Sequence, residues 1–298
     1  MHRVFVTGAT GFVGRAVIQA LRAEGHVVRC LVRRGSERDL HGFEAIERVE
    51  GDVQAGPAAL EAGIAGCDTV IHLVGIIREF PASGITFDRV HVQGTRNVVE
   101  AAGRVGVRRF LHMSALGTRA GARARYHQTK WAAEELVRAS GLAWTIVRPS
   151  VIYGVGDGFI SLLARMVRRL PVVPVIGDGQ NRLQPVPVEH VAAGFARAVR
   201  VEAAVKQTYA VAGAEVVTMQ GLLALIGSIL DRRVRTVRIP LGLMRPMAHV
   251  LHRVPSFPVT PDQLLMLEED NTGNAEPFYA AFGLSPEPLA HGLRRILR

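Results

Sequence analysis

The sequence has little cysteine and few aromatic residues. Its two cysteines, Cys30 and Cys67, lie in or beside apolar stretches and lack the spacing of metal ligands. We therefore expect two small core residues in a reducing compartment, and no metal site. Aromatic residues make up 6% of the chain and are not interleaved with the basic ones, so we expect no nucleic-acid platform.

Long apolar runs are also missing. No stretch reaches the ~18 residues that a membrane-spanning helix needs. The longest candidates are Gly221–Leu230 and Leu241–Leu251, and Arg245 and Pro246 interrupt the second. The chain starts directly with its first expected strand, so we expect no signal peptide. These absences predict a cytoplasmic protein.

Acidic residues are outnumbered. The chain has 36 Lys and Arg against 26 Asp and Glu, a formal charge of +10. Such a surplus favours anionic partners such as a phosphorylated cofactor or acidic lipid headgroups. Most of it is scattered arginine, and the clusters Arg119–Arg125, Arg232–Arg238 and Arg294–Arg298 are interpreted as solvated basic faces.

What the sequence does have is a glycine-rich turn at its start. The apolar run Val4–Val6 precedes the turn Thr7–Gly14, and an apolar-periodic segment follows it. Strand, turn and helix form the context of a dinucleotide-binding fingerprint, here with G-x-x-G-x-x-G spacing. Glycines let the backbone approach a pyrophosphate closely, and the helix amino end favours the phosphates. The expected contacts are Gly8, Thr10, Gly11, Phe12, Val13 and Gly14.

The second expected strand, Val27–Val32, ends at Arg33 and Arg34. An acidic residue ~20 residues beyond the glycines would bind the ribose hydroxyl of NAD, but two arginines stand there instead. A guanidinium can bind a phosphate with two hydrogen bonds, so the sequence favours NADP(H) over NAD(H). The alternative is that both arginines are simply exposed charges at a strand end.

Strands and helices alternate through the first half of the chain. This predicts an α/β fold, a doubly wound parallel sheet of the Rossmann type over residues 1–152, to which the helix Glu189–Arg200 returns. Asp52 and Val53 follow the third strand, where a carboxylate can meet the adenine. The further expected strands are Ile46–Glu50, Thr69–Val74, Val107–Met113 and Ala143–Val147, and a long helix is expected from about Phe87 to Gly103.

The regular alternation of strands and helices ends after Ser150, where prolines become frequent. Residues 153–298 are predicted to form a smaller C-terminal α/β cap domain. A cap over the carboxyl ends of the strands makes the cleft in which such sheets bind substrates. Its expected elements are Thr208–Ala212, Met219–Leu230, Val234–Ile239 and the helix after Pro240.

Tyr126 and Lys130 lie one turn apart on a helix expected over Tyr126–Ser140, and Ser114 ends a strand. A nearby ammonium lowers the pKa of a tyrosine from about 10, so we predict that Tyr126 exchanges a proton near neutral pH. Ser114 would then hold a carbonyl or alcohol oxygen. The alternative is an ordinary helix surface. His72, within an apolar strand, is interpreted as a core histidine.

With these pieces, the chain resembles the short-chain dehydrogenase/reductase superfamily in its extended, epimerase-like branch. The likeness is carried by Thr7–Gly14, Asp52-Val53, Ser114-Ala115, Tyr126–Lys130 and Arg148-Pro149-Ser150. It implies that Ser114, Tyr126 and Lys130 are catalytic, with Tyr126 and Lys130 also on the cofactor. It further implies cofactor contacts from Leu73, Val74, Gly75, Pro149 and Ser150.

A narrower resemblance is to the NAD(P)H-binding accessory subunits of respiratory complex I and their bacterial relatives. It is carried by His72–Ile76, Ser114–Gly117, Thr260–Gln263 and Glu269–Asn271. It implies a tightly held cofactor and a setting near complex I or quinone metabolism. His91 stands where the superfamily usually has an asparagine, and the segment from Ser114 to Tyr126 is short for a sugar-nucleotide epimerase.

Three functions therefore stay open. The first is an oxidoreductase acting on a carbonyl, an alcohol or a quinone-related partner. The second is a cofactor-stabilised structural or assembly subunit, and the third is a sugar-nucleotide epimerase or dehydratase. The basic surplus and the apolar stretch Leu241–Val254 also predict contact with the inner face of a membrane, unless that stretch packs inside the cap.

Overall fold

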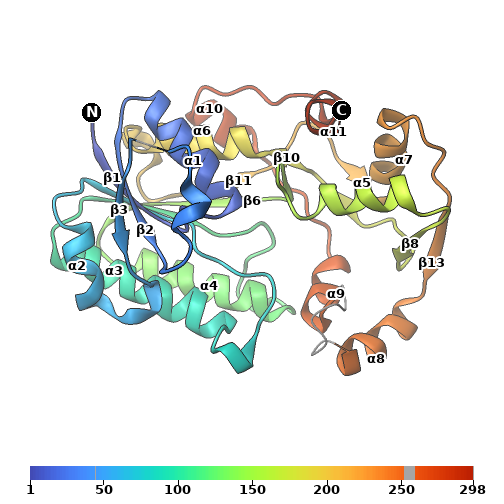
Figure 1. The fold of residues 1–298 in the computed structure, drawn as a ribbon, viewed down its shortest axis with the longest axis horizontal. Coiled ribbons are helices and arrows are strands. Elements are labelled where there is room, and N and C mark those ends of the chain that lie inside the picture. The colour runs from blue at the N-terminus through green and yellow to red at the C-terminus, as the bar shows by residue number, and fades with distance from the viewer. Residues whose placement is uncertain (44, 252–258, 298) are drawn as a thin grey trace. The chain divides into compact units, whose positions relative to one another are not determined.

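The computed structural model describes residues 1–43, 45–251 and 259–297, which form two compact units. Figure 1 shows the path of the chain through both. The first unit comprises Met1–Pro149, Val188–Val211 and Ala275–Leu284, and the second comprises Ser150–Pro187, Ala212–Asn274 and Ser285–Arg298.

The first unit is built on a seven-stranded sheet whose neighbouring strands are all parallel. The strands are β1 (Arg3–Thr7), β2 (Val27–Val32), β3 (Glu47–Glu50), β4 (Thr69–His72), β5 (Arg109–Met113), β6 (Ala143–Pro149) and β11 (Gln207–Val211). Their order is β11-β6-β5-β4-β1-β2-β3. The order reverses between β1 and β4, and ligands of such sheets bind beyond the carboxyl ends at that point. The doubly wound fold is confirmed.

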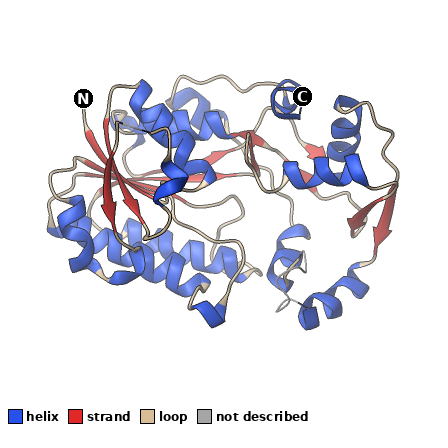
Figure 2. Ribbon diagram, in the orientation of Figure 1, coloured by secondary structure: helices blue, strands red, loops and turns tan. Residues whose placement is uncertain are grey.

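Helices cover both faces of this sheet, as Figures 1 and 2 show. On one face lie α1 (Phe12–Ala23) and α6 (Val188–Ala198), and on the other lie α2 (Pro57–Ile64), α3 (Gly94–Arg104) and α4 (Arg125–Arg138). Strands covered on both sides are mostly apolar, as Val4–Val6 of β1 and Val70-Ile71 of β4 show, whereas the edge strand β3 alternates charged and apolar residues. Phe5, Val70 and Phe110 are fully buried in the core that α2 and α3 cover.

Two elements differ from the prediction. The strand expected over Thr208–Ala212 was assigned to the cap, but β11 is the outer strand of the main sheet, with Thr208 opposite Ile146. Helix α10 (Glu276–Ala281) also belongs to the first unit, where Phe278 packs its ring 6.4 Å from that of Tyr209. Both segments join the sheet through contacts with residues far away in the sequence.

The helix expected from Phe87 to Gly103 starts as a π-helix, η4 (Asp88–Gln93), and continues as α3. A π-helical turn inside an α-helix is often found at a functional site. The first unit also has the short 3₁₀ turns η1 (Glu37–Leu40), η2 (Val53–Ala55), η3 (Pro81–Ser83) and η5 (Glu202–Ala204).

The second unit contains short strand pairs and a small helical core. Its elements are β7 (Ile152–Tyr153), α5 (Ile160–Arg169), β8 (Val173–Ile176), β9 (Arg182–Leu183), β10 (Val186–Pro187), β12 (Val217–Thr218), α7 (Met219–Ile229), β13 (Thr236–Ile239), α8 (Leu241–Leu251), α9 (Pro261–Leu267) and α11 (Leu289–Leu297). Strand β7 pairs with β10, β8 with β13 and β9 with β12. Thr260 and Gln263 form a capping box at the start of α9.

None of the helices in the described ranges combines the length and the apolar character needed to cross a membrane. The stretch Leu241–Val254, singled out from the sequence, is described only as far as Leu251; its last three residues lie outside the described residues.

Candidate cofactor and catalytic site

The glycine turn is shaped by close backbone contacts. Gly8 has φ +74°, and a Cβ atom there would lie 3.0 Å from the backbone carbonyl carbon of Leu73. A Cβ atom on Gly14 would lie 2.1 Å from the carbonyl oxygen of Gly8. A side chain at Gly8 would therefore push the turn away from the end of β4. A side chain at Gly14 would push α1 away from the turn. Glycine is therefore required at both positions, at Gly8 for the turn and at Gly14 for the close approach of α1.

The amino end of α1 faces this turn without a side-chain cap. Gly11 is the residue that caps the helix, and its N–H donates to the carbonyl oxygen of Gly8 at 3.1 Å. As a glycine, Gly11 supplies no side-chain cap to the N–H groups of the first turn of α1. These N–H groups and the helix dipole suit a phosphate.

A cavity of about 310 Å³ lies at the carboxyl ends of β1, β2, β3 and β4. The predicted cofactor residues that line it are Gly8, Thr10, Gly11, Arg33, Asp52, Val53, Leu73, Val74 and Gly75. A size of a few hundred Å³ is typical of small-molecule sites. Phe12, Val13, Gly14, Pro149, Ser150, Tyr126 and Lys130, also predicted on the cofactor, are not among the lining residues.

Sequence reasoning missed part of the lining: Leu31, Gly51, Gln54, Ile76, Phe80, Ile85 and Val90. Phe80 and Ile85 exchange two backbone hydrogen bonds, of 2.7 and 3.2 Å, and so close a small loop after β4. This loop has no apolar periodicity, so only its position immediately after Gly75 could have drawn attention to it.

A second, more open hollow adjoins the first and shares Arg33, Gly51 and Asp52 with it. Arg34, Ser36 and Glu50 complete its lining. Both arginines are exposed, so their guanidinium groups can reach an anion in the hollow. One carboxylate oxygen of Asp52 accepts a hydrogen bond of 2.8 Å from the N–H of Gln54, which caps the turn η2.

These observations fit a dinucleotide. The glycine turn is a cradle that a single Cβ atom would fill, the helix end next to it lacks a side-chain cap, and the cavity leads to a pair of arginines.

Lys130 lies directly beside the cavity. A Cβ atom on Gly75 would be 3.9 Å from its Nζ atom, which donates a hydrogen bond of 2.6 Å to the carbonyl oxygen of Met113. The side chain is buried, and burial lowers the pKa of Lys130 to about 8, although the carboxylate of Glu134 opposes this shift. Lys130 therefore joins the end of β5 to the cofactor contact predicted at Gly75.

Tyr126 is packed among aromatic rings. The rings of Phe87, His91 and His127 lie 6.0, 5.5 and 5.2 Å from its own, all edge-on. Burial raises the pKa of Tyr126 to about 12. This is opposite to the lowered pKa predicted from the sequence, because desolvation dominates at Tyr126 and the ammonium of Lys130 is directed at Met113. Tyr126 is therefore a protonated phenol at neutral pH.

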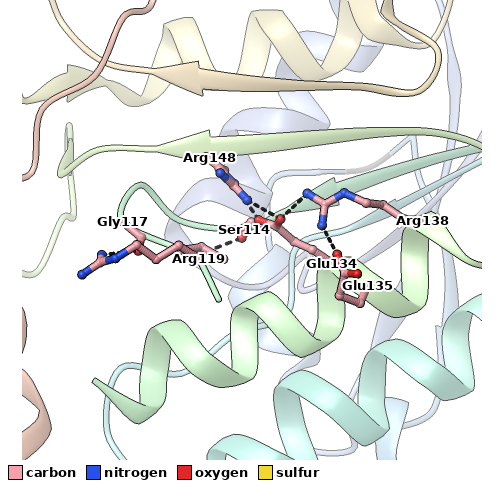
Figure 3. Close-up of polar contacts among 8 residues, drawn as sticks. Ser114, Gly117, Arg119, Glu134, Glu135, Arg138 and Arg148 are labelled. Carbon is pink, nitrogen blue, oxygen red and sulfur yellow. Dashed lines mark hydrogen bonds and ion pairs between the residues drawn. The ribbon is translucent and has the colours of Figure 1, made fainter. Parts of the chain in front are cut away.

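Ser114 is buried just after β5 (Figure 3). Its N–H donates to the carbonyl oxygen of Val147 at 2.7 Å, and its hydroxyl donates weakly to the hydroxyl oxygen of Thr118 at 3.4 Å. The loop that follows is braced by Arg119, which donates to the carbonyl oxygen of Gly117. Ser114, Tyr126 and Lys130 thus come from β5 and α4 of the same unit.

Two buried histidines border Lys130. His91 accepts a hydrogen bond of 3.0 Å at Nε2 from the N–H of Ile76, so its Nδ1 carries the proton and donates to Thr129 at 2.9 Å. His72 is bonded to the hydroxyls of Thr7 and Thr95, which confirms the core role predicted for it. Burial lowers the pKa of His91 to about 2 and that of His72 to about 3, so both are neutral.

Pro149 and Ser150 lie where β6 ends. The carbonyl oxygen of Pro149 accepts a hydrogen bond of 2.8 Å from the N–H of Leu116. Within the second unit, the hydroxyl of Ser150 donates to Oδ1 of Asn271 at 2.7 Å, and the N–H of Val151 donates to the same oxygen at 3.0 Å. Asn271 therefore fixes the backbone at Ser150. A cofactor contact from these two residues stays a prediction.

The sequence matches two family models. Residues 8–158 match the model described as NAD(P)H-binding, and residues 119–246 match the RmlD substrate binding domain. The first match covers half of the chain. The protein belongs to the NAD(P)H-binding Rossmann proteins of the short-chain dehydrogenase/reductase superfamily, as the resemblance implied.

Two relatives illustrate the range of this family. The ceramide reductase of Caulobacter vibrioides is 37% identical over 190 residues, which are 64% of this chain and 58% of the relative. Subunit 9 of the NADH dehydrogenase [ubiquinone] 1 alpha subcomplex of Arabidopsis thaliana is 28% identical over 281 residues, 89% of this chain and 68% of the relative. This chain therefore spans less than two thirds of the ceramide reductase.

Solved structures share the fold. MoeE5 in complex with UDP-glucose and NAD has a TM-score of 0.77 and 22% identity, covering 99% of this chain and 97% of that protein. At this level of identity the similarity establishes the architecture and leaves the activity to be argued from the site.

Proposed function

We propose that the protein is an NADP(H)-dependent oxidoreductase that interconverts a carbonyl and an alcohol. The observation that carries the proposal is the approach of the Lys130 Nζ atom to Gly75, because it joins the predicted catalytic helix to the dinucleotide cavity. The ceramide reductase among the relatives supports a reductive reaction.

Different residues of this chain would bind the different parts of the dinucleotide. The turn from Gly8 to Gly14 and the amino end of α1 would hold the pyrophosphate, and Arg33 and Arg34 would hold the 2′-phosphate of NADP(H). Asp52 and Val53 would border the adenine, and Leu73 to Gly75 would border the nicotinamide. When bound, the nicotinamide supplies or accepts a hydride.

Proton transfer and orientation of the substrate oxygen are assigned to side chains of α4 and of Ser114, which follows β5. The phenol of Tyr126, protonated at neutral pH, donates its proton to the substrate oxygen in the reductive direction and takes it back in the oxidative one. Ser114 orients that oxygen. The ammonium of Lys130, which lies beside Gly75, would bind the nicotinamide ribose.

The substrate is proposed to be apolar. The loop after Gly75 exposes Ile77 and Phe80 at 61% and 46%, and Phe80 also lines the cavity. Large exposed apolar side chains beside a site favour an apolar ligand. The lipid substrate in the name of the ceramide reductase agrees with this choice, and a quinone has the same character.

The test is NADPH oxidation with long-chain ketones and quinones as acceptors. Replacing Tyr126 by Phe is expected to lower kcat by about 10²- to 10⁴-fold, because the proton donor is lost while the rings around it are kept. The Kd for NADPH, measured in parallel, should stay within about threefold of wild type. If the wild-type protein holds the cofactor but reduces no acceptor, the result favours the structural-subunit alternative. Binding of a nucleotide sugar would favour the epimerase alternative.

We also propose that the second unit binds an anionic membrane surface. Leu243, Met247 and Val250 lie at i, i+4 and i+7 on α8 and are 55%, 38% and 74% exposed. Arg235 and Arg238, on the preceding segment, are exposed as well. An apolar stripe beside arginines suits the headgroup region of an acidic bilayer. The relative named as a subunit of an NADH dehydrogenase complex supports a setting in a respiratory complex.

Vesicle sedimentation tests this second proposal. Binding to vesicles with acidic lipids should weaken as salt rises, because the headgroup attraction is screened. The double substitution L243S/V250S is expected to reduce binding, while L162S, at an exposed leucine of α5, should leave it unchanged. Equal binding to neutral vesicles, or equal loss in both variants, would contradict it.

A further inference from the structure

Glu134 is a completely buried carboxylate one helical turn after Lys130. Burying a carboxylate is costly unless it is paired. Two arginines pair it: Arg148 donates from Nε at 2.8 Å and from Nη2 at 2.6 Å, and Arg138 donates from Nη2 at 2.6 Å. Figure 3 shows both guanidinium groups converging on Glu134.

Aromatic rings hold the two arginines in place. The guanidinium carbon of Arg138 lies 5.0 Å from the centre of the Trp131 ring and 5.9 Å from that of Trp144, and the guanidinium carbon of Arg148 lies 5.8 Å from Trp131. Such stacking fixes the plane of an arginine and favours its charge. Glu134, Arg138, Arg148 and Trp131 therefore form a rigid unit, the Glu134 cluster, which joins α4 to the end of β6.

The surroundings of Lys130 explain why this cluster matters. A buried ammonium needs hydrogen bonds and an opposite charge. Its hydrogen bond goes to a backbone carbonyl oxygen, that of Met113. The groups that interact with it electrostatically are the carboxylate of Glu134 on α4 and the imidazoles of His72 on β4, His112 on β5 and His91 on η4. Arg138 on α4 and Arg148 on β6 act on Lys130 through Glu134, with which both are paired. The three imidazoles are neutral, because burial lowers the pKa of each.

We propose that Glu134 is a positioning residue for Lys130: clamped by Arg138 and Arg148, its carboxylate keeps the buried ammonium charged and fixes the helix turn that carries it. The inference rests on the proposed function, in which Lys130 contacts the cofactor. Pro149 follows Arg148 directly, so the same carboxylate ties together the two elements, α4 and β6, that are assigned to the cofactor.

The chain offers an unusually direct measurement. It contains two lysines, Lys130 and Lys206, so selective isotope labelling of lysine side chains gives two NMR signals in the full-length protein. Lys206 is exposed and serves as an internal reference, and K206R assigns the two signals. A pH titration then reports the pKa of Lys130 without any need for turnover.

The two partners are expected to shift this titration in opposite directions. Replacing Glu134 by Gln removes the negative charge and should lower the pKa of Lys130 by about 1 pH unit or more. Replacing Arg148 by Gln removes a positive charge and should raise it. Glu135 is the matched control: it is the next residue, is half exposed and also pairs with Arg138, so E135Q should leave the titration of Lys130 unchanged.

Shifts of the same sign in E134Q and R148Q would overturn the proposal, since they would show that both residues act through packing alone. An unchanged titration in E134Q would also overturn it. Thermal unfolding monitors the folding of each variant, and if E134Q does not fold, E134D, which withdraws the carboxylate by one methylene, should shift the pKa in the same direction as predicted for E134Q. Absence of NADPH uptake by the wild-type protein would refute the proposed function and leave the lysine titration as a separate result.

Discussion

At the scale of single residues, the choice between the two nicotinamide dinucleotides depends on the arginines after β2. Arg34 lines the second, more open hollow but does not line the cavity of about 310 Å³. Replacing it by Ser should raise the Kd for NADPH about fivefold and leave that for NADH unchanged, because an exposed charge pair contributes at most about 1 kcal/mol. Calorimetric titration of both cofactors is the measurement.

Arg38 is the matched control for Arg34. It is an exposed arginine four residues further on and lies outside both linings. R38S should therefore bind NADPH as the wild type does. If R34S weakens NADH and NADPH equally, the arginine does not bind the 2′-phosphate.

The residues that could be predicted are those whose role is local. Gly8, Gly11 and Gly14 act within one turn, and their spacing is enough to identify them. The role of Glu134 could not be predicted in this way, because its buried state depends on Arg148, fourteen residues away on another element. The raised pKa of Tyr126 was missed for the same reason, since it follows from packing with the distant Phe87 and His91.

At the scale of elements, the packing of α1 against the glycine turn is the most sensitive contact of the cofactor site. In G14A the new methyl group would meet the carbonyl oxygen of Gly8, so α1 must move away from the turn. We expect the unfolding free energy to fall by about 1–3 kcal/mol. NADPH affinity should fall more than 100-fold, because a displacement of about 1 Å already spoils such a site.

Gly103 provides the comparison within another helix. A Cβ atom there has no neighbour within 4 Å, and the residue is exposed near the end of α3. G103A should be neutral or stabilising by about 0.5–1 kcal/mol in urea denaturation, because alanine favours the helix. Equal behaviour of the two variants would mean that the contact between Gly14 and Gly8 is unimportant.

Elements with a clear local pattern were predicted almost residue by residue, as β2 (Val27–Val32) shows. The placement of β11 could not be predicted, since a strand at the edge of a sheet is defined by its partner β6, some sixty residues earlier in the chain. The π-helical start before α3 was also missed, because an extra residue in one turn leaves the apolar periodicity nearly unchanged.

At the scale of the whole molecule, the buried histidines make stability depend on pH. Burial lowers the pKa of His72, His91 and His112 below the ordinary 6.5, so the unfolded chain binds more protons than the folded one under acid conditions. Their contribution is complete above pH 6.5 and is lost as the pH falls below it. Between pH 7 and 5.5 the unfolding free energy should drop by about 1.2 kcal/mol for each histidine, about 4 kcal/mol in total.

Urea denaturation at several pH values measures this dependence. His112 is the best residue to remove, because it is fully buried and neither of its ring nitrogens has a hydrogen-bond partner among the described residues. In H112F, one proton fewer is taken up on unfolding under acid conditions. The slope of the unfolding free energy against pH should therefore fall by about 1.4 kcal/mol per pH unit. A slope that is the same in H112F as in the wild type would show that His112 is not neutral in the folded protein.

We propose that the glycine turn and the amino end of α1 bind a nicotinamide dinucleotide. Isothermal titration calorimetry of the folded protein, freed of any copurified nucleotide, tests it most directly. We expect saturable uptake of NADPH at one site per chain, with weaker uptake of NADH. No uptake of either dinucleotide, oxidised or reduced, by protein that is shown to be folded would contradict it.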